Sequence, residues 1–270
     1  MKRIEKTFAQ LKLQKKCALI GYICAGDPDY GVSLELLKNM PAAGCDIVEL
    51  GVPFLDPAGD GPVIEAASKR AIENGASLKT TLQMVAEFRK INASTPVVLM
   101  GYYNPFLKYG LEKIFADADL AGVDGVLIVD LPFEERDEIA KHIKATNLDF
   151  IDLIAPLTDE ERIKKIASNA SGFLYLISML GVTGTKQAVV EENKINLQKI
   201  RNNSNLPVAI GFGIQEPAQA REFADIGADG VVIGSVIVKE IYQNFVAKKS
   251  DAEIVKHVCE KIAGFKKIMN

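Results

Sequence analysis

The sequence predicts an α/β fold, a single (β/α)8 TIM barrel with an extra N-terminal helix, and three observations favour it. Short apolar runs alternate with amphipathic helical segments along the whole chain. Most of these runs are continuously apolar, as expected for parallel strands covered on both faces. The length of 270 residues suits eight such units in one barrel domain, residues 1–270.

The first element is an amphipathic segment of about residues 1–14, which we expect to cover the bottom of the barrel. The predicted strands follow it, at residues 18–24, 47–50, 97–100, 125–129, 150–154, 173–177, 208–211 and 230–233.

Helical segments with apolar residues three and four apart accompany the strands, at residues 34–44, 82–91, 111–122, 135–145, 159–168, 196–203, 217–227 and 251–265. Three junctions, AAGCDIVEL, LAGVDGVLI and DIGADGVVI, are typical of a glycine C-cap followed by strand entry. Alternating strands and helices imply a parallel sheet, either closed or open. Eight units, and no GxGxxG after the first strand, favour the closed barrel.

Composition excludes several function classes. With 48% hydrophobic and 25% charged residues the chain can bury a large core, and its net charge of −3 offers no basic surface for nucleic acid. We find neither a signal-peptide pattern nor a membrane-length apolar run, so we expect a cytoplasmic protein. The four cysteines and two histidines show no ligand spacing, so we expect no metal site.

Catalytic groups of such barrels lie at the C-terminal ends of the strands, and Glu49 closes the second predicted strand among apolar neighbours. Burial raises the pKa of a carboxyl group toward the range where it can both donate and accept a proton. The alternative is a Glu49 paired with a buried cation, but no basic residue ends another predicted strand.

The loop after Glu49, GVPFLDPAGDGP, places Asp60 between Gly59 and Gly61. Prolines fix part of its path while the glycines free the backbone, a composition suited to a loop that holds a carboxylate over a ligand. The alternative is that Asp60 is an ordinary turn residue, because Asp-Gly is a common turn signal.

Glycines after the last two strands predict a phosphate site. Gly213 follows the seventh strand, whereas Gly234 and Ser235 follow the eighth, with Ser235 expected as the N-cap of the next helix. Their backbone N–H groups would converge on one anion. Gly184, in the GVTGTK stretch after the sixth strand, is expected on a mobile lid over the same group. Simple turns are the alternative for each glycine.

Several motifs resemble the tryptophan synthase α-subunit family over essentially the whole chain. They are DIVELGVPFLDPAGDGP, GDP at 26–28, MGYYNP at 100–105, GVTG at 181–184, GFGI at 211–214 and GSVIV at 234–238. The resemblance implies a lyase of tryptophan biosynthesis that splits indole-3-glycerol phosphate into indole and glyceraldehyde 3-phosphate. Glu49 would be the general acid and base, and Asp60 would accept a hydrogen bond from the indole N–H.

The resemblance also implies an indole pocket of apolar and aromatic side chains, formed by Tyr22, Ile64, Met100, Leu127, Val129 and Phe212. Tyr175 would hold Glu49 or the glycerol chain, and Thr183 on the lid would reach Asp60. Ordinary core packing is the alternative for each pocket residue.

The partner implied by the resemblance is a β subunit that carries pyridoxal phosphate, in an α2β2 complex that channels indole; no cofactor is expected in this chain. The expected docking surface comprises Asp56, Asn104, Pro105 and Phe106. The sequence departs from the family pattern at Cys24, Leu55, Gly59 and Met179. We hypothesise that Leu55 and Gly59 change how the Asp60 loop orders.

Two other functions stay open at this point. Related phosphate-binding barrels, such as an indole-glycerol-phosphate synthase or a ribulose-phosphate epimerase, need a catalytic lysine or a metal set, and no lysine ends a predicted strand here. A partner-activating subunit with little catalysis of its own is the third possibility.

Overall fold

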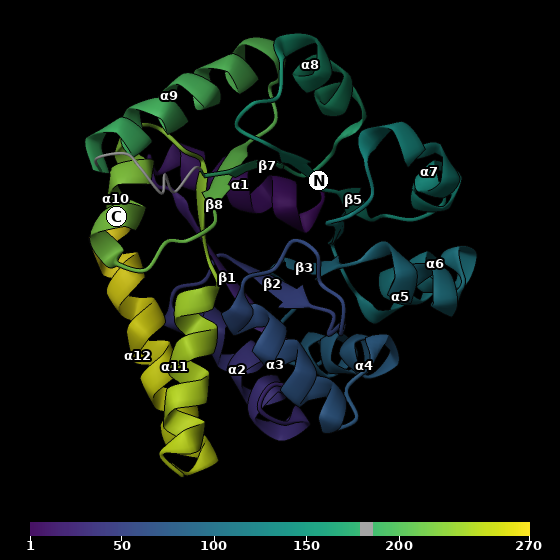
Figure 1. The fold of residues 1–270 in the computed structure, drawn as a ribbon, viewed down its shortest axis with the longest axis vertical. Coiled ribbons are helices and arrows are strands. Elements are labelled where there is room, and N and C mark those ends of the chain that lie inside the picture. Colours follow the sequence, from purple (N-terminus) through teal and green to yellow (C-terminus); the bar gives the residue numbers. More distant parts are fainter. Residues whose placement is uncertain (179–185) are drawn as a thin grey trace.

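The computed structural model describes residues 1–178 and 186–270. Its strands form one parallel sheet in the order β5-β4-β3-β2-β1-β9-β8-β7-β6, and helices surround the sheet (Figure 1). β5 and β6 stand at the two ends of this order yet are consecutive in the chain, separated only by Ile151. The ladder therefore closes on itself, which confirms the predicted barrel.

The strands lie close to their predicted positions. Their bounds are β1 Ala18–Cys24, β2 Ile47–Gly51, β3 Val97–Gly101, β4 Gly125–Ile128, β5 Asp149–Phe150, β6 Asp152–Ile154, β7 Leu174–Ile177, β8 Val208–Gly211 and β9 Gly230–Ile233. The expected fifth strand at 150–154 is divided, because β5 pairs with β4 whereas β6 pairs with β7. Ile151 thus marks the seam of the barrel.

The helices also follow the predicted alternation. They are α1 Arg3–Leu13, α2 Tyr30–Ala43, α3 Pro62–Glu73, α4 Leu78–Arg89, α5 Tyr103–Tyr109, α6 Leu111–Ala121, α7 Asp137–Lys144, α8 Glu160–Asn169, α9 Lys186–Asn203, α10 Pro217–Asp225, α11 Ser235–Val246 and α12 Asp251–Met269, with a 3-10 turn at Phe133–Glu135. α3 and α5 were not predicted from the sequence. Among the described residues, no helix has the length and apolarity needed to cross a membrane.

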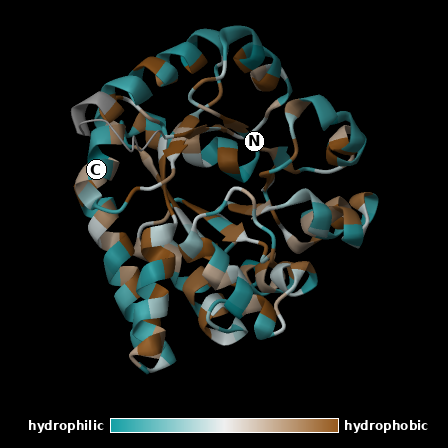
Figure 2. Ribbon diagram, viewed as in Figure 1, coloured by the Kyte–Doolittle hydropathy of each residue, from teal (hydrophilic) through white to brown (hydrophobic). Residues whose placement is uncertain are grey.

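Side chains inside and outside the barrel form separate apolar layers. Alternate strand residues such as Ile20, Ile47 and Val98 pack in the interior, while their neighbours pack against the helices. Figure 2 shows the hydrophobic colour on strands and on inward helix faces, with hydrophilic faces outside. Helix α1 contributes Phe8 to the interior cluster, where its ring lies 5.6 Å from that of Phe173. This packing confirms the expected role of the N-terminal helix as a cover.

The predicted glycine-acid junctions recur as strand anchors. The glycine after each helix has positive φ, +116° at Gly44, +89° at Gly122 and +96° at Gly227. The aspartate that follows accepts the N–H of the neighbouring strand, in the pairs Asp46 with Leu19 at 2.7 Å, Asp124 with Val97 at 2.8 Å and Asp229 with Val208 at 2.9 Å. Each aspartate also pairs with a cation, respectively Lys266, Arg89 and Arg201.

Asp124→Ala is expected to lower the free energy of unfolding by about 3 kcal/mol, because it leaves a buried cation without its partner. The Asp124 carboxylate binds Arg89, Arg3 and the Val97 N–H, and burial lowers the pKa of Arg89 to about 10. Urea unfolding measures the change. Asp225→Ala, which removes an exposed i,i+4 pair, is the control and should change stability by less than about 0.5 kcal/mol. Equal effects in both variants would contradict the anchoring role.

Candidate active site

Glu49 points into the barrel. Its neighbours Val48 and Leu50 pack outward against the helices, and the alternation of β2 turns Glu49 to the interior beside Tyr22 of β1. The residue is 2% exposed, and its Oε1 has no hydrogen-bond partner among the described residues. A buried carboxyl oxygen without a partner is costly unless it serves a ligand.

Burial, with a smaller contribution from the charge of Asp60, raises the pKa of Glu49 to about 8. The carboxyl is therefore mostly protonated at neutral pH and can donate a proton, whereas its ionised form can take one back. The position predicted from sequence as a general acid and base thus has the required electrostatics.

Asp60 lies in the loop between β2 and α3, and this loop is held by Tyr102, which was not among the predicted site residues. The Tyr102 hydroxyl accepts the N–H of Gly59 at 3.1 Å, and the Tyr102 ring lies 5.4 Å from that of Phe54. Burial raises the pKa of Asp60 to about 6, although the Tyr102 hydroxyl opposes that rise. The sequence signal for Tyr102 was its position directly after β3.

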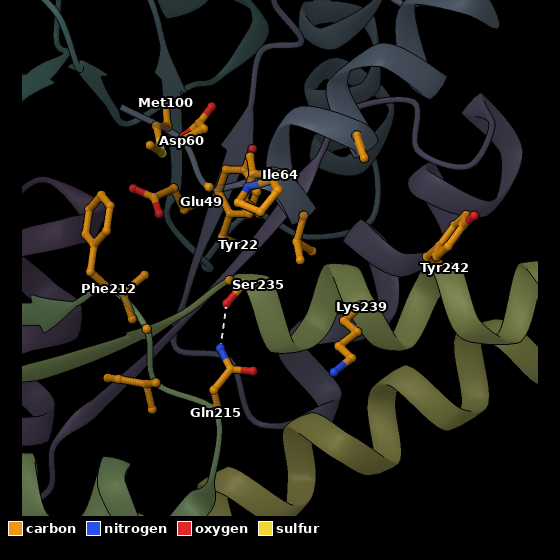
Figure 3. Close-up of a pocket in the computed structure, with 18 of the residues that line it drawn as sticks. Tyr22, Glu49, Asp60, Ile64, Met100, Phe212, Gln215, Ser235, Lys239 and Tyr242 are labelled. Carbon is orange, nitrogen blue, oxygen red and sulfur yellow. Dashed lines mark hydrogen bonds between the residues drawn. The ribbon is translucent and has the colours of Figure 1, made fainter. Parts of the chain in front are cut away.

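One cavity of about 980 Å³ brings the two acids together with most of the predicted contact residues. Figure 3 shows Glu49, Asp60 and Met100 grouped at one end, with Tyr22 and Ile64 beside them. The predicted residues that line it are Tyr22, Glu49, Asp60, Ile64, Met100, Tyr175, Phe212, Gly213, Gly234 and Ser235. A volume of this size suits a small organic ligand.

Two buried tyrosines shape the walls by packing over glycines. A Cβ at Gly51 would overlap the Tyr22 hydroxyl, and a Cβ at Gly211 would overlap the Tyr175 hydroxyl. Burial raises the pKa of both phenols well above the ordinary value, so both stay neutral. The glycines at these strand ends therefore make room for the rings.

Some predicted residues lie elsewhere. Leu127 is 1% exposed in the barrel interior and does not line the cavity, and Val129 borders a smaller neighbouring cavity instead. Leu127 lies within β4 and Val129 directly follows it, and the depth of these side chains along the barrel could not be predicted from the sequence. Thr183, Gly184 and Met179 lie outside the described residues.

The opposite end of the cavity is built from the β8–α10 and β9–α11 loops. Phe212 and Gly213 have positive φ, +87° and +71°, and Ser178 Oγ donates to the Phe212 carbonyl at 2.6 Å. The expected N-cap is corrected: Gly234 caps α11 and Ser235 is its first helical residue, so no side chain caps this end. Ser235 Oγ instead pairs with Gln215 Nε2 at 2.9 Å (Figure 3).

Other lining residues were not predicted. Many of them lie on α3 and α11, whose cavity-facing sides could not be recognised from sequence, and the rest lie in β9 or in loops. They are Gly61, Pro62, Val63, Ala66, Arg70, Ser178, Ile214, Gln215, Val232, Lys239, Tyr242 and Gln243. Neither His142 nor His257 is among the residues that line the cavity.

The expected docking residues differ in exposure. Asp56 and Asn104 are exposed and Pro105 is half-buried. Phe106 is completely buried, with its ring 6.3 Å from that of Phe115, so its side chain is not part of an accessible surface. The inclusion of Phe106 in the docking surface was therefore wrong for this conformation, because α5 turns that side chain into the core.

The departures from the family pattern have local explanations in part. Leu55 is 62% exposed, whereas Cys24 is buried and burial raises the pKa of its thiol to about 12. A Cβ at position 59 would lie 2.9 Å from Val129 Cγ1, so Gly59 fits closely where alanine would force a shift. The effect of Leu55 and Gly59 on loop order stays a prediction.

The chain is similar to known proteins over its whole length. The family model described as tryptophan synthase alpha chain matches residues 8–269. Tryptophan synthase subunit alpha from Legionella pneumophila str. Paris is 35% identical with a TM-score of 0.91, over 100% of this chain and 98% of that one. A chain of the tryptophan synthase a2b2 complex from Pyrococcus furiosus is 34% identical with a TM-score of 0.83, over 93% and 98%. Tryptophan synthase from M. tuberculosis is 31% identical with a TM-score of 0.83, over 98% of this chain and 99% of that one. The chain therefore belongs to the tryptophan synthase alpha chain family.

Proposed function

We propose that Glu49 and Asp60 carry out the reaction of this family in the chain, the cleavage of indole-3-glycerol phosphate to indole and glyceraldehyde 3-phosphate. The observation that carries the proposal is the buried Glu49 carboxyl, which has a raised pKa and an unpartnered oxygen in the same cavity as Asp60. Perturbed titratable groups that share a cavity are expected at active sites.

In the first step Glu49 gives its proton to C3 of the indole ring, and the ring nitrogen becomes positively charged. Asp60 accepts a hydrogen bond from the ring N–H and stabilises that charge. Because Asp60 lies in a partly buried loop, its carboxylate acts at low effective dielectric and is already oriented by the Gly59–Tyr102 contact.

In the second step the Glu49 carboxylate takes the proton of the glycerol hydroxyl next to the reacting carbon. That oxygen becomes the aldehyde oxygen as the carbon–carbon bond breaks, and the bonding electrons return to the ring, which restores neutral indole. Glu49 ends protonated, so one residue completes the cycle, and the ring itself is the electron sink.

The cavity walls support this orientation of the substrate. Tyr22 and Phe212 supply aromatic surface for the indole ring, with Ile64 and Met100 beside it. We propose that Gly213 after β8, together with Gly234 and Ser235 at the start of α11, holds the phosphate through backbone N–H groups. Gly184 would add to this phosphate site, and Thr183 would reach Asp60. Tyr175, whose ring lies 6.2 Å from that of Phe212 and which lines the same cavity as Glu49, would contact the glycerol chain.

The direct test is indole release from indole-3-glycerol phosphate by the purified chain, with and without a tryptophan synthase β subunit. Release by the chain alone supports catalysis by this subunit. Release by neither sample, with the chain folded, would refute the proposed reaction, and a chain that only stimulates the β reaction would be a partner-activating subunit.

The pH dependence of indole release should be bell-shaped. Activity requires Asp60 ionised, so it rises as the pH increases through about 6; it requires Glu49 protonated, so it falls as the pH increases through about 8. Because the charges of Glu49 and Asp60 interact, the two apparent pKa values of this profile describe the pair of residues together. Measuring kcat/KM from pH 5 to 10 checks this, and activity still rising at pH 9 would contradict the assignment of Glu49 as proton donor.

We also infer a partner. The Pyrococcus furiosus relative forms an α2β2 complex. We propose the same assembly for this chain, with Asp56, Asn104 and Pro105 in the docking surface. The pyridoxal phosphate chemistry would belong to the β subunit, since the cleavage needs only general acid–base groups. We further propose that residues 1–270 act as one domain in the cytoplasm, a location supported by four free cysteines.

A further inference from the structure

The cavity contains a cation, Lys239, that the reaction described above does not use. We propose that the Lys239 ammonium group binds the phosphate of the substrate and so fixes the direction in which the substrate enters. This inference rests on the proposed function and adds a charged side chain to a phosphate site otherwise made of backbone N–H groups.

Lys239 lies one turn after Ser235 on α11, and residues four apart share a face of a helix. Both line the cavity together with Gly213 and Gly234. In Figure 3 the Lys239 side chain projects from α11 on the side where Gln215 lies, and the Gln215 amide binds Ser235 Oγ at 2.9 Å. The ammonium group is therefore on the side of the cavity where the glycine loops meet.

The charge of Lys239 is not neutralised by the described part of the chain. No carboxylate of residues 1–178 or 186–270 forms an ion pair with it. Arg70, which also lines the cavity, binds both oxygens of buried Asp27 at 2.8 and 3.1 Å and stacks on Tyr242. Among the described lining residues, Lys239 is thus the cation left for a ligand.

The N-terminal end of α11 also favours the binding of an anion at this place. Its first turn contains no acidic residue and no side chain caps it, so the positive end of the helix dipole is uncompensated within the described residues. A lysine close to that end would be mildly unfavourable by itself. A phosphate dianion would satisfy the helix end and the lysine at once.

The resulting polarity of the cavity matches the substrate. Glu49 and Asp60 lie at one end, and Lys239 lies toward the other (Figure 3). A substrate bound in reverse would bring its phosphate against two carboxyl groups, which disfavours that orientation. Lys239 therefore selects for phosphorylated substrates and for the orientation that places the indole ring at Glu49.

The test compares Lys239→Met with Lys239→Arg, which keeps the charge, and with Lys267→Met, an exposed lysine of α12 away from the cavity. We expect Lys239→Met to raise the KM for indole-3-glycerol phosphate by roughly 10- to 100-fold with little change in kcat, the size of one charge-assisted hydrogen bond. The inhibition constant of inorganic phosphate should rise in parallel. Lys239→Arg should recover most of the loss, and Lys267→Met should behave as wild type.

KM and phosphate inhibition within twofold of wild type in Lys239→Met would overturn the assignment. So would a fall in kcat at unchanged KM, which indicates disturbance of the acids instead. If wild type releases no indole, the proposed reaction has failed, and calorimetric titration of inorganic phosphate decides on Lys239 separately: weaker binding to Lys239→Met than to Lys267→Met supports it, and equal binding refutes it.

Discussion

Glu49→Gln is expected to lower the rate of indole release by about 10²- to 10⁴-fold, the contribution of a positioned general acid and base. Glutamine keeps the shape of the side chain but can neither give a proton to C3 nor accept one from the glycerol hydroxyl. Since the cavity walls and the anion end are unchanged, the KM for indole-3-glycerol phosphate should change little. Steady-state indole release, with and without the β subunit, measures both parameters.

A stability measurement is the control for Glu49→Gln. The pKa of Glu49 is about 8 in the folded chain against an ordinary 4.5, so folding favours the protonated form. The wild-type free energy of unfolding therefore falls by about 1.4 kcal/mol per pH unit between these values, and this loss is complete above about pH 8. The variant lacks this titration and should be at least as stable as wild type at pH 9. Activity above a tenth of wild type in a folded variant would show that Glu49 is not the acid.

Asp60→Asn is expected to lower kcat by about 10²- to 10³-fold, as does the loss of one preorganised electrostatic contact to a transition state. Asparagine can still accept a hydrogen bond from the ring N–H but carries no negative charge to stabilise the protonated ring. The low-pH limb of the activity profile should disappear as well, since the group that titrates near pH 6 is gone.

Glu73→Gln is the matched control for Asp60→Asn, because Glu73 is an exposed acid on α3 that does not line the cavity. It removes the same charge from the same region and should leave kcat unchanged. A similar loss in both variants would mean that Asp60 acts only through the general field of the loop and not through contact with the ring.

Much of the fold could be predicted because each strand and helix end is marked by residues that are neighbours in the sequence. Each apolar run had to be covered on both faces, and the glycine-acid junctions at Gly44 and Gly122 marked helix ends directly. Glu49 was also recognisable, since a lone acid inside an apolar strand requires a reason for its burial. The position of Gly213 and Gly234 at the cavity could be predicted because the order of the barrel fixes their places after the last two strands.

The remaining features depend on distances that the chain order does not contain. Phe106 follows a proline near the barrel mouth, and only the rotation of α5 shows that its ring enters the core. Lys239 has the pattern of a solvated helix residue, and only the neighbouring β8–α10 loop gives it a role. The break at Ile151 arises because the first half of the predicted fifth strand, β5, pairs with β4, whereas the second half, β6, pairs with β7. This division results from closure of the barrel and not from the local sequence.

The aspartate anchors described above lie at the N-terminal ends of the strands, and the reactive groups lie at their C-terminal ends. Stability and catalysis therefore depend on residues at opposite ends of the barrel. An engineer could exchange the loops around the cavity to accept another substrate while Asp46, Asp124 and Asp229 keep the strands in register. Loop exchanges at the N-terminal ends of the strands would instead disturb these aspartate anchors. They would lower stability and would not change the reactive groups.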